Sequence, residues 1–169
     1  MKARELGALL LLGSIWGASY LFIKVAVQVF PPLTLVTLRV VLAALTSLLI
    51  LRLRGIALPR SRAMWGTFLV MGLFNGAVPY SLITWGEQRI DSGLAAILIA
   101  TSPIFTVIFA HLFLHDERMT VTKVAGILLG FVGVAILIGP AAVAGAGQSL
   151  MGDLAVVLAS ASYGATIVY

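Results

Sequence analysis

The sequence predicts an all-α polytopic membrane protein, in which closely spaced helices each cross a lipid bilayer. Of the 169 residues, 61% are hydrophobic and only 10% are charged, and the mean hydropathy is +1.12. Soluble domains carry about 25% charged residues. Because so few polar side chains could not cover a globular surface, we expect the lipid bilayer to cover it instead.

Six apolar stretches are long enough to cross a bilayer, which takes about 20 helical residues. They cover residues 6–29, 33–53, 64–85, 94–114, 121–142 and 151–169. Pro31-Pro32 is expected to end the first stretch, since proline disfavours the helical conformation in the residue before it. The cations before the first stretch are also typical of a secretory signal. That stretch is longer than the apolar region of a signal, however, so we expect a retained helix.

Lysines and arginines are divided unequally between alternate loops. One side holds Lys2, Arg4, Arg52, Arg54, Arg60, Arg62, Arg118 and Lys123, and the other holds Arg89 together with Lys24 and Arg39 inside nearby spans. Cytoplasmic loops carry the excess of these cations in membrane proteins. The sequence therefore predicts a multi-pass protein of the inner or plasma membrane with a cytoplasmic N-terminus. The same pattern accounts for the net charge of +5 without a nucleic-acid partner.

The sixth span repeats part of the first. Trp16-Gly17-Ala18-Ser19 corresponds to Tyr163-Gly164-Ala165-Thr166, and the same shift places Gly13 on Ser160. Both copies thus keep small residues four apart, a spacing that lets helices approach closely in lipid. Because an odd number of crossings separates the copies, the second is inverted, as in many secondary transporters. We expect a five-helix repeat over 1–145 and, over 146–169, a linker and the first helix of a second, incomplete repeat. The chain would then be truncated, and its missing second half or a second copy would complete it.

Several spans carry residues that resemble those of a known family. They are Trp16-Gly17, Tyr20 and Lys24 in the first span, Pro32 and Arg39 in the second, the run from Leu94 to Phe105 with Leu114 and Glu117 in and after the fourth, and Gly126, Gly130 and Gly133 in the fifth. In these positions the chain resembles the EamA-like branch of the drug/metabolite transporter superfamily. Members look like ten-helix proteins of two inverted repeats that export amino acids, other metabolites or drugs. The resemblance implies a secondary transporter that exports a small-molecule substrate by alternating access.

Polar and aromatic side chains within or beside the spans are the candidates for a substrate pathway. They are Trp16, Tyr20, Lys24, Arg39, Asn75, Tyr80, Trp85, Glu87, Thr101, Ser102 and Pro103. A cation inside a span is costly, so Arg39 is expected either to attract anionic groups into a cavity or to tie helix ends together. Lys24 is expected to snorkel to the interface or to act as an anchor. Our hypothesis is an outer charge cluster of Lys24, Arg39 and Glu87, although Glu87 could instead carry protons.

Pro103 predicts a break in its helix, and Asn75 predicts polar surroundings within its span. Pro103 interrupts the fourth span after Thr101-Ser102 and frees a backbone carbonyl that hydroxyls or water must satisfy. Such a break either lines a cavity or bends the helix for packing. Asn75 needs hydrogen-bond partners in hydrocarbon, so a polar pathway is expected beside it. Gly72 and Gly76, which flank it, equally suit a close helix contact.

The sequence leaves other functions open. A membrane-embedded lipid-modifying enzyme would need polar groups at one interface, and the nearest match is His111, His115, Asp116 and Glu117. The two histidines lack a third metal ligand, and no Walker A or dinucleotide-binding glycine pattern is present. We therefore expect no enzyme activity, no catalytic residues, no cofactor and no metal. A non-functional transporter fragment, or a half-transporter that works as an antiparallel dimer, also stays open.

Overall fold

The chain folds into helices joined by short turns. The computed structural model describes residues 3–114, 119–138, 140 and 144–169. Its elements are α1 (Ala3–Ala26), α2 (Pro32–Leu53), α3 (Arg62–Gly72), the π-helix η1 (Leu73–Ala77), α4 (Val78–Gly86), α5 (Ser92–Ile99), α6 (Ser102–Phe113), α7 (Val121–Ile138) and α9 (Leu150–Val168). The described residues contain no strand, so the all-α prediction is confirmed.

Five helical stretches are long and apolar enough to cross a bilayer. Within the described residues they are Arg4–Ala26, Pro32–Leu53, Arg62–Gly86, Ser92–Phe113 and Leu150–Val168. These stretches match five of the six predicted spans, and the protein is a multi-pass membrane protein. The remaining prediction, 121–142, falls on α7, in which residues Val121–Ile136 form a shorter apolar helix. Positions 139 and 141–142 of that prediction lie outside the described residues.

The first helix is shorter than the sequence predicts. We expect it to continue to Val29, but α1 ends at Ala26, and the N–H groups of Val29 and Phe30 both donate to the Ala26 carbonyl, at 3.1 and 2.9 Å. The chain thus turns before the proline pair instead of at it. α2 then begins at Pro32, where a missing N–H costs nothing because the first turn has no helical acceptor for it.

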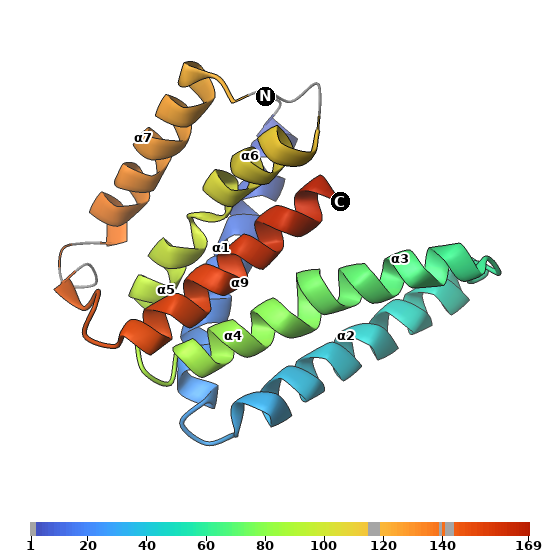
Figure 1. Ribbon diagram of the computed structural model, residues 1–169. Helices are drawn as coiled ribbons and strands as arrows, with labels where there is room; N and C mark the ends of the chain where they lie inside the picture. The colour runs from blue at the N-terminus through green and yellow to red at the C-terminus, as the bar shows by residue number, and fades with distance from the viewer. Residues whose placement is uncertain (1–2, 115–118, 139, 141–143) are drawn as a thin grey trace.

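α9 lies in the middle of the bundle. It packs against α4, α5, α6 and η1, and Figure 1 shows it crossing between α6 and α4. Glycines allow this close approach. A Cβ on Gly164 would lie 2.6 Å from the Phe105 Cβ, and a Cβ on Gly86 would lie 2.7 Å from the Val156 Cγ2. α9 is therefore seated among the helices that precede it in the sequence.

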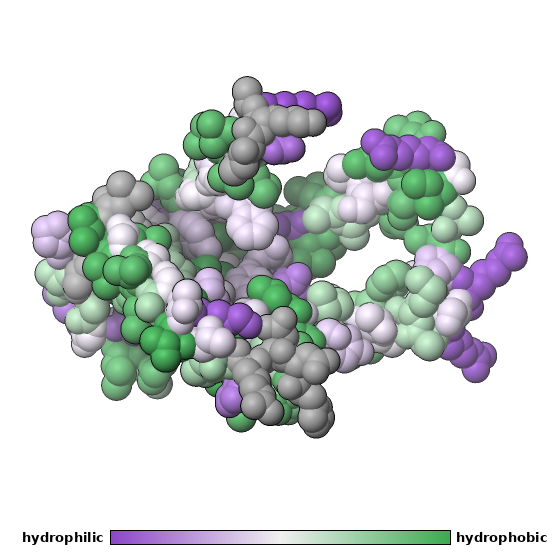
Figure 2. Space-filling model, turned by 90° about the horizontal axis from the view of Figure 1, so that it is seen from above, coloured by the Kyte–Doolittle hydropathy of each residue, from purple (hydrophilic) through white to green (hydrophobic). Residues whose placement is uncertain are grey.

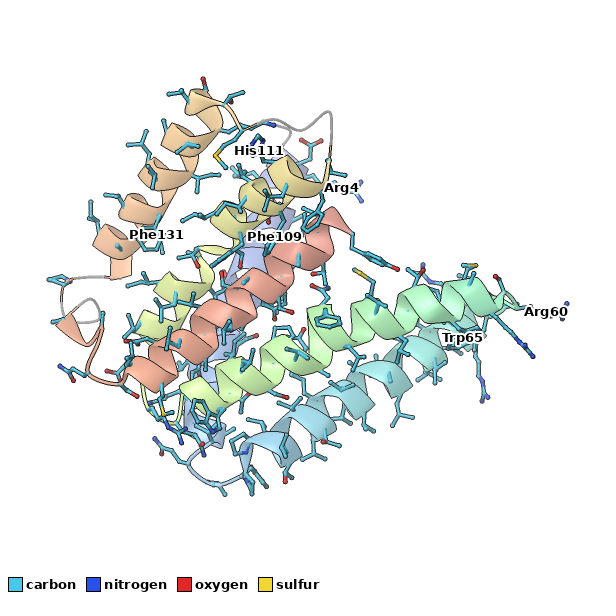
Figure 3. The ribbon with its side chains drawn as sticks, viewed as in Figure 1. Arg4, Arg60, Trp65, Phe109, His111 and Phe131 are labelled. Carbon is cyan, nitrogen blue, oxygen red and sulfur yellow. The ribbon has the colours of Figure 1, made fainter. Side chains whose placement is uncertain are left out.

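The outer surface is apolar, as a lipid-facing surface must be. Large side chains such as Leu10, Phe22 and Leu129 are more than half exposed. In Figure 2 apolar residues cover much of the visible face, and polar ones gather at the α2–α3 end. Figure 3 places Arg4 near the start of α1 and Arg60 in the loop between α2 and α3, both away from the α4–α5 turn.

Candidate functional site

A cavity of about 550 Å³ lies between α1, α2, η1, α4, α9 and the junction of α5 with α6. Its wall is formed by side chains from segments far apart in the sequence. The lining residues are Trp16, Ser19, Tyr20, Ile23, Arg39, Asn75, Tyr80, Ile83, Ile99, Ser102, Tyr163 and Ile167. Small-molecule sites typically enclose about 300–1,000 Å³ with mostly apolar walls and a few polar groups. The cavity thus has the size and lining of a small-molecule site.

The cavity brings together about half of the residues that the sequence singles out for a pathway. Those that line it are Trp16, Tyr20, Arg39, Asn75, Tyr80 and Ser102. Those that do not line it are Lys24, Trp85, Glu87, Thr101 and Pro103. The second group lies near the α4–α5 turn or at the break in the fourth span, and two of its members, Lys24 and Thr101, bind neighbouring helices or turns.

Arg39 contacts an aromatic ring inside the cavity. Its Cζ atom lies 4.2 Å from the centroid of the Tyr80 ring, a distance at which a guanidinium is attracted by the ring. Arg39 forms no hydrogen bond or ion pair with any described residue. Of the two roles left open for Arg39, the geometry fits the cavity-facing one better than the tying of helix ends.

Lys24 takes the structural role instead. Its Nζ donates to the carbonyl oxygens of Glu87 and Ile90, at 2.8 and 2.6 Å. These carbonyls follow the end of α4, where a helix leaves acceptors unsatisfied and where a cation is favoured. Lys24 therefore fastens α1 to the α4–α5 turn.

The Glu87 side chain is fully buried in that turn. Neither carboxylate oxygen has a hydrogen-bond partner, and no ion pair joins it to Lys24 or Arg39 within the described residues. Burial raises the pKa of Glu87 to about 8, and the nearby Lys24 ammonium opposes the rise. Lys24 and Glu87 are thus neighbours as the hypothesis of an outer charge cluster requires, but Arg39 is paired with Tyr80.

The predicted break in the fourth span separates α5 from α6. Because Pro103 has no N–H to offer the Ile99 carbonyl, that carbonyl accepts from the Ser102 hydroxyl at 2.8 Å. Both Thr101 and Ser102 also contact the buried hydroxyl of Ser160 on α9, at 2.7 and 3.1 Å. The break therefore has two roles: Ser102 lines the cavity, and Thr101 and Ser102 bind α9 through Ser160.

The third span contains a break that was not predicted from the sequence. η1 inserts one π-turn, closed by the N–H of Val78 donating to the Leu73 carbonyl, directly before Pro79. Asn75 lies in this turn, and its Oδ1 accepts from the Thr166 hydroxyl on α9 at 3.2 Å. Asn75 lines the cavity, and its amide N–H groups form no hydrogen bond with the described residues. π-turns of this kind often occur at functional sites.

Six lining residues were not predicted as pathway residues. They are Ser19, Ile23, Ile83, Ile99, Tyr163 and Ile167. Tyr163 could have been found, because the internal repeat aligns it with Trp16. The isoleucines could not have been recognised from the sequence, because a cavity-lining isoleucine and a lipid-facing isoleucine have the same apolar sequence context.

Trp85 lies apart from the cavity. Arg89 covers its ring, with the Cζ atom 3.7 Å from the ring centroid, and donates to the Trp85 carbonyl at 3.0 Å. This exposed arginine and its aromatic partner lie at the α4–α5 end of the bundle, as an interfacial aromatic residue would.

The family follows from comparison with known proteins. The model of the EamA-like transporter family matches residues 4–139. The chain belongs to the EamA-like transporter family. The resemblance found in the sequence is thereby confirmed.

Two curated relatives of this EamA-like chain are named as transporters. It is 30% identical over 155 residues to the uncharacterized transporter YoaV of Bacillus subtilis, covering 92% of this chain and 53% of YoaV. It is 37% identical over 142 residues to the uncharacterized inner membrane transporter YedA of Escherichia coli K12, covering 81% of this chain and 45% of YedA. The chain thus spans about half the length of the curated relatives it matches. No solved structure matches it.

The histidines considered for an enzyme are placed only in part. His111 lies near the end of α6, where its Nδ1 accepts from the Met119 N–H at 3.4 Å, and Figure 3 shows it at the same end of the bundle as Arg4. His115, Asp116 and Glu117 lie outside the described residues. Membership of a transporter family favours transport over the enzymatic alternative.

Proposed function

We propose that the protein is a secondary transporter and that the cavity is part of the path along which it exports a small metabolite, amino acid or drug. The observation that carries this proposal is the convergence of six independently predicted pathway residues on one cavity of about 550 Å³. Polar and charged side chains are costly within a membrane and commonly mark a substrate pathway. An arginine, an amide and a serine around one cavity therefore favour transport.

Alternating access between two inverted repeats is the mechanism we infer. Residues 1–145 form the first repeat, and 146–169 form the linker and first helix of the second. The central position of α9 supports this arrangement, since it brings Tyr163 to the cavity that its repeat counterpart Trp16 also lines. The missing second half, or a second copy of the chain, supplies the other wall. The N-terminus faces the cytoplasm, and the membrane is the cell membrane.

Filling the cavity tests this function without knowledge of the substrate. Ser19 lines the cavity and donates only within its own helix, to the Ile15 carbonyl at 3.1 Å, so Ser19→Trp adds bulk without breaking a contact between helices. Ser47 is an exposed serine on α2 that does not line the cavity, which makes Ser47→Trp the matched control.

The assay measures loss of compounds from proteoliposomes loaded with a bacterial small-molecule extract, followed by mass spectrometry. Wild-type protein and the Ser47→Trp variant should release at least one component faster than empty vesicles, and the Ser19→Trp variant should release it at least tenfold more slowly. If no component is released faster by the wild type, or if both variants release it equally, the proposed function is wrong.

A further inference from the structure

Arg39 is a cation within the membrane whose guanidinium has no hydrogen-bond acceptor among the described residues. It lies on the membrane span α2, half-buried, and the described residues offer its guanidinium an aromatic ring but no carboxylate and no carbonyl. Lys24 on the neighbouring span has two carbonyl acceptors at 2.8 and 2.6 Å. Since a charge within the membrane is costly unless it is paired, Lys24 is satisfied by the fold, whereas Arg39 is not.

The unsatisfied donors of Arg39 face the cavity. Arg39 is one of the lining residues, and among the lining residues it is the one that carries a charge. The Tyr80 ring stabilises the guanidinium electrostatically but supplies no oxygen atom to its N–H groups. A guanidinium with open N–H groups binds carboxylate, phosphate or sulfonate oxygens through paired, charge-assisted hydrogen bonds.

The other lining residues indicate what kind of group lies beside the anion in a bound molecule. Around Arg39 it presents the rings of Trp16, Tyr20 and Tyr163 and the branched side chain of Ile83. Rings of this kind pack against flat apolar groups through offset or edge-to-face contacts. No aspartate or glutamate is among the lining residues, so nothing in the described wall pairs with a ligand cation.

We propose that Arg39 is the anion-binding residue of the cavity and that the transported molecule carries an acidic group on a flat, apolar body. This inference rests on the proposed function and adds the chemical class of the substrate. It assigns Tyr80 the task of holding the guanidinium in place and the aromatic wall the task of binding the body of the molecule.

A pair of probes that differ only in charge tests the inference. 1-Naphthylacetate carries a carboxylate, and 1-naphthylacetamide has nearly the same shape but is neutral. Their affinities for the protein are measured by equilibrium dialysis in nanodiscs of zwitterionic lipid. The wild type should bind the carboxylate at least tenfold more tightly than the amide, because a charge-assisted pair is worth roughly that factor or more.

Two arginine variants locate the effect. Arg39→Gln should lower the affinity for the carboxylate at least tenfold and change that for the amide less than twofold. Arg89→Gln removes the other arginine that covers an aromatic ring, outside the cavity, and should change neither. Circular dichroism and a single elution peak show that each variant is folded. If the wild type binds neither probe or does not distinguish them, or if Arg39→Gln acts like Arg89→Gln, the inference is wrong.

Two further experiments are needed. The first distinguishes a lipid headgroup from a transported anion, and the second distinguishes failure of this inference from failure of the proposed function. If phosphatidylglycerol in the nanodisc competes with the carboxylate in the wild type but not in Arg39→Gln, a lipid headgroup occupies the site and the assignment to a substrate is wrong. In the extract assay above, release of neutral or cationic components that persists in Arg39→Gln would overturn this inference while the proposed function stands. Absence of any release would overturn both.

Discussion

The contact between α9 and α6 gives a quantitative test of the packing. A Cβ added to Gly164 would lie 2.6 Å from the Phe105 Cβ and 2.8 Å from the backbone nitrogen of Thr106. Neither atom can move by a change of rotamer, so in the Gly164→Ala variant α9 and α6 must separate. Overpacking of this kind costs about 1–3 kcal/mol, and the gain in helix propensity from glycine to alanine returns about 1 kcal/mol. Because the contact is with backbone, we expect the upper part of the range, a net loss of about 2 kcal/mol.

Gly130 on α7 provides the matched control, since a Cβ there would meet nothing within 4 Å. Gly130→Ala should therefore leave the stability unchanged or raise it by up to about 1 kcal/mol. The free energy of unfolding is measured for both variants by titration with dodecyl sulfate in mixed micelles, with circular dichroism as the signal. Equal midpoints for Gly164→Ala and Gly130→Ala would refute the close packing of α9 on α6.

Two further predictions concern buried polar groups. Because the pKa of Glu87 rises to about 8 in the folded protein, that state binds the proton more tightly than the unfolded chain. Stability should then fall as pH rises from about 5 to about 8, and Glu87→Gln should remove this slope in the same micelle titration; a wild type whose stability rises over that range would contradict the burial of this carboxylate. Ser160→Ala should lose about 1 kcal/mol, since it removes the hydroxyl that contacts Thr101 and Ser102, and an unchanged midpoint would show that these contacts do not hold α9.

The spans could be predicted from the sequence because hydropathy reports them directly. Their breaks are harder to predict. Pro103 marks the break between α5 and α6 because its missing N–H frees the Ile99 carbonyl, and the hydroxyls beside it are visible in the sequence. η1 leaves no such pattern in hydropathy, although Pro79, which cannot bond the carbonyl four residues earlier, is a signal that was available.

Small-residue spacing predicted close packing but not its location. The pair Ser160 and Gly164 is buried against other helices, whereas a Cβ on the matching Gly17 would meet nothing within 4 Å. The same holds for Gly72, directly before η1, and for Gly76, within it, since a Cβ on either would meet nothing within 4 Å. Spacing shows that a helix can be approached closely, but which helix approaches it depends on the tertiary arrangement.

Candidate residues could be recognised as polar groups in spans, yet their roles depended on geometry. Lys24 and Arg39 look alike in sequence, each being a cation with apolar residues around it in a membrane span. The fold gives the first two carbonyl acceptors and gives the second a tyrosine ring beside a cavity. Charge and hydropathy could not separate these outcomes, because they depend on where a helix end lies relative to each side chain.

The measurement that tests the central claim most directly is the access of water to the cavity from each side of the membrane. The sequence contains no cysteine, so Ser19→Cys introduces a unique thiol in the cavity, and Ser47→Cys introduces one on the exposed face of α2. A membrane-impermeant methanethiosulfonate reagent is applied to oriented vesicles from one side or the other. We predict that the thiol at position 19 reacts from both sides, as alternating access requires, and that the thiol at position 47 reacts from neither. A thiol at position 19 that is as unreactive as the one at position 47 would contradict the account.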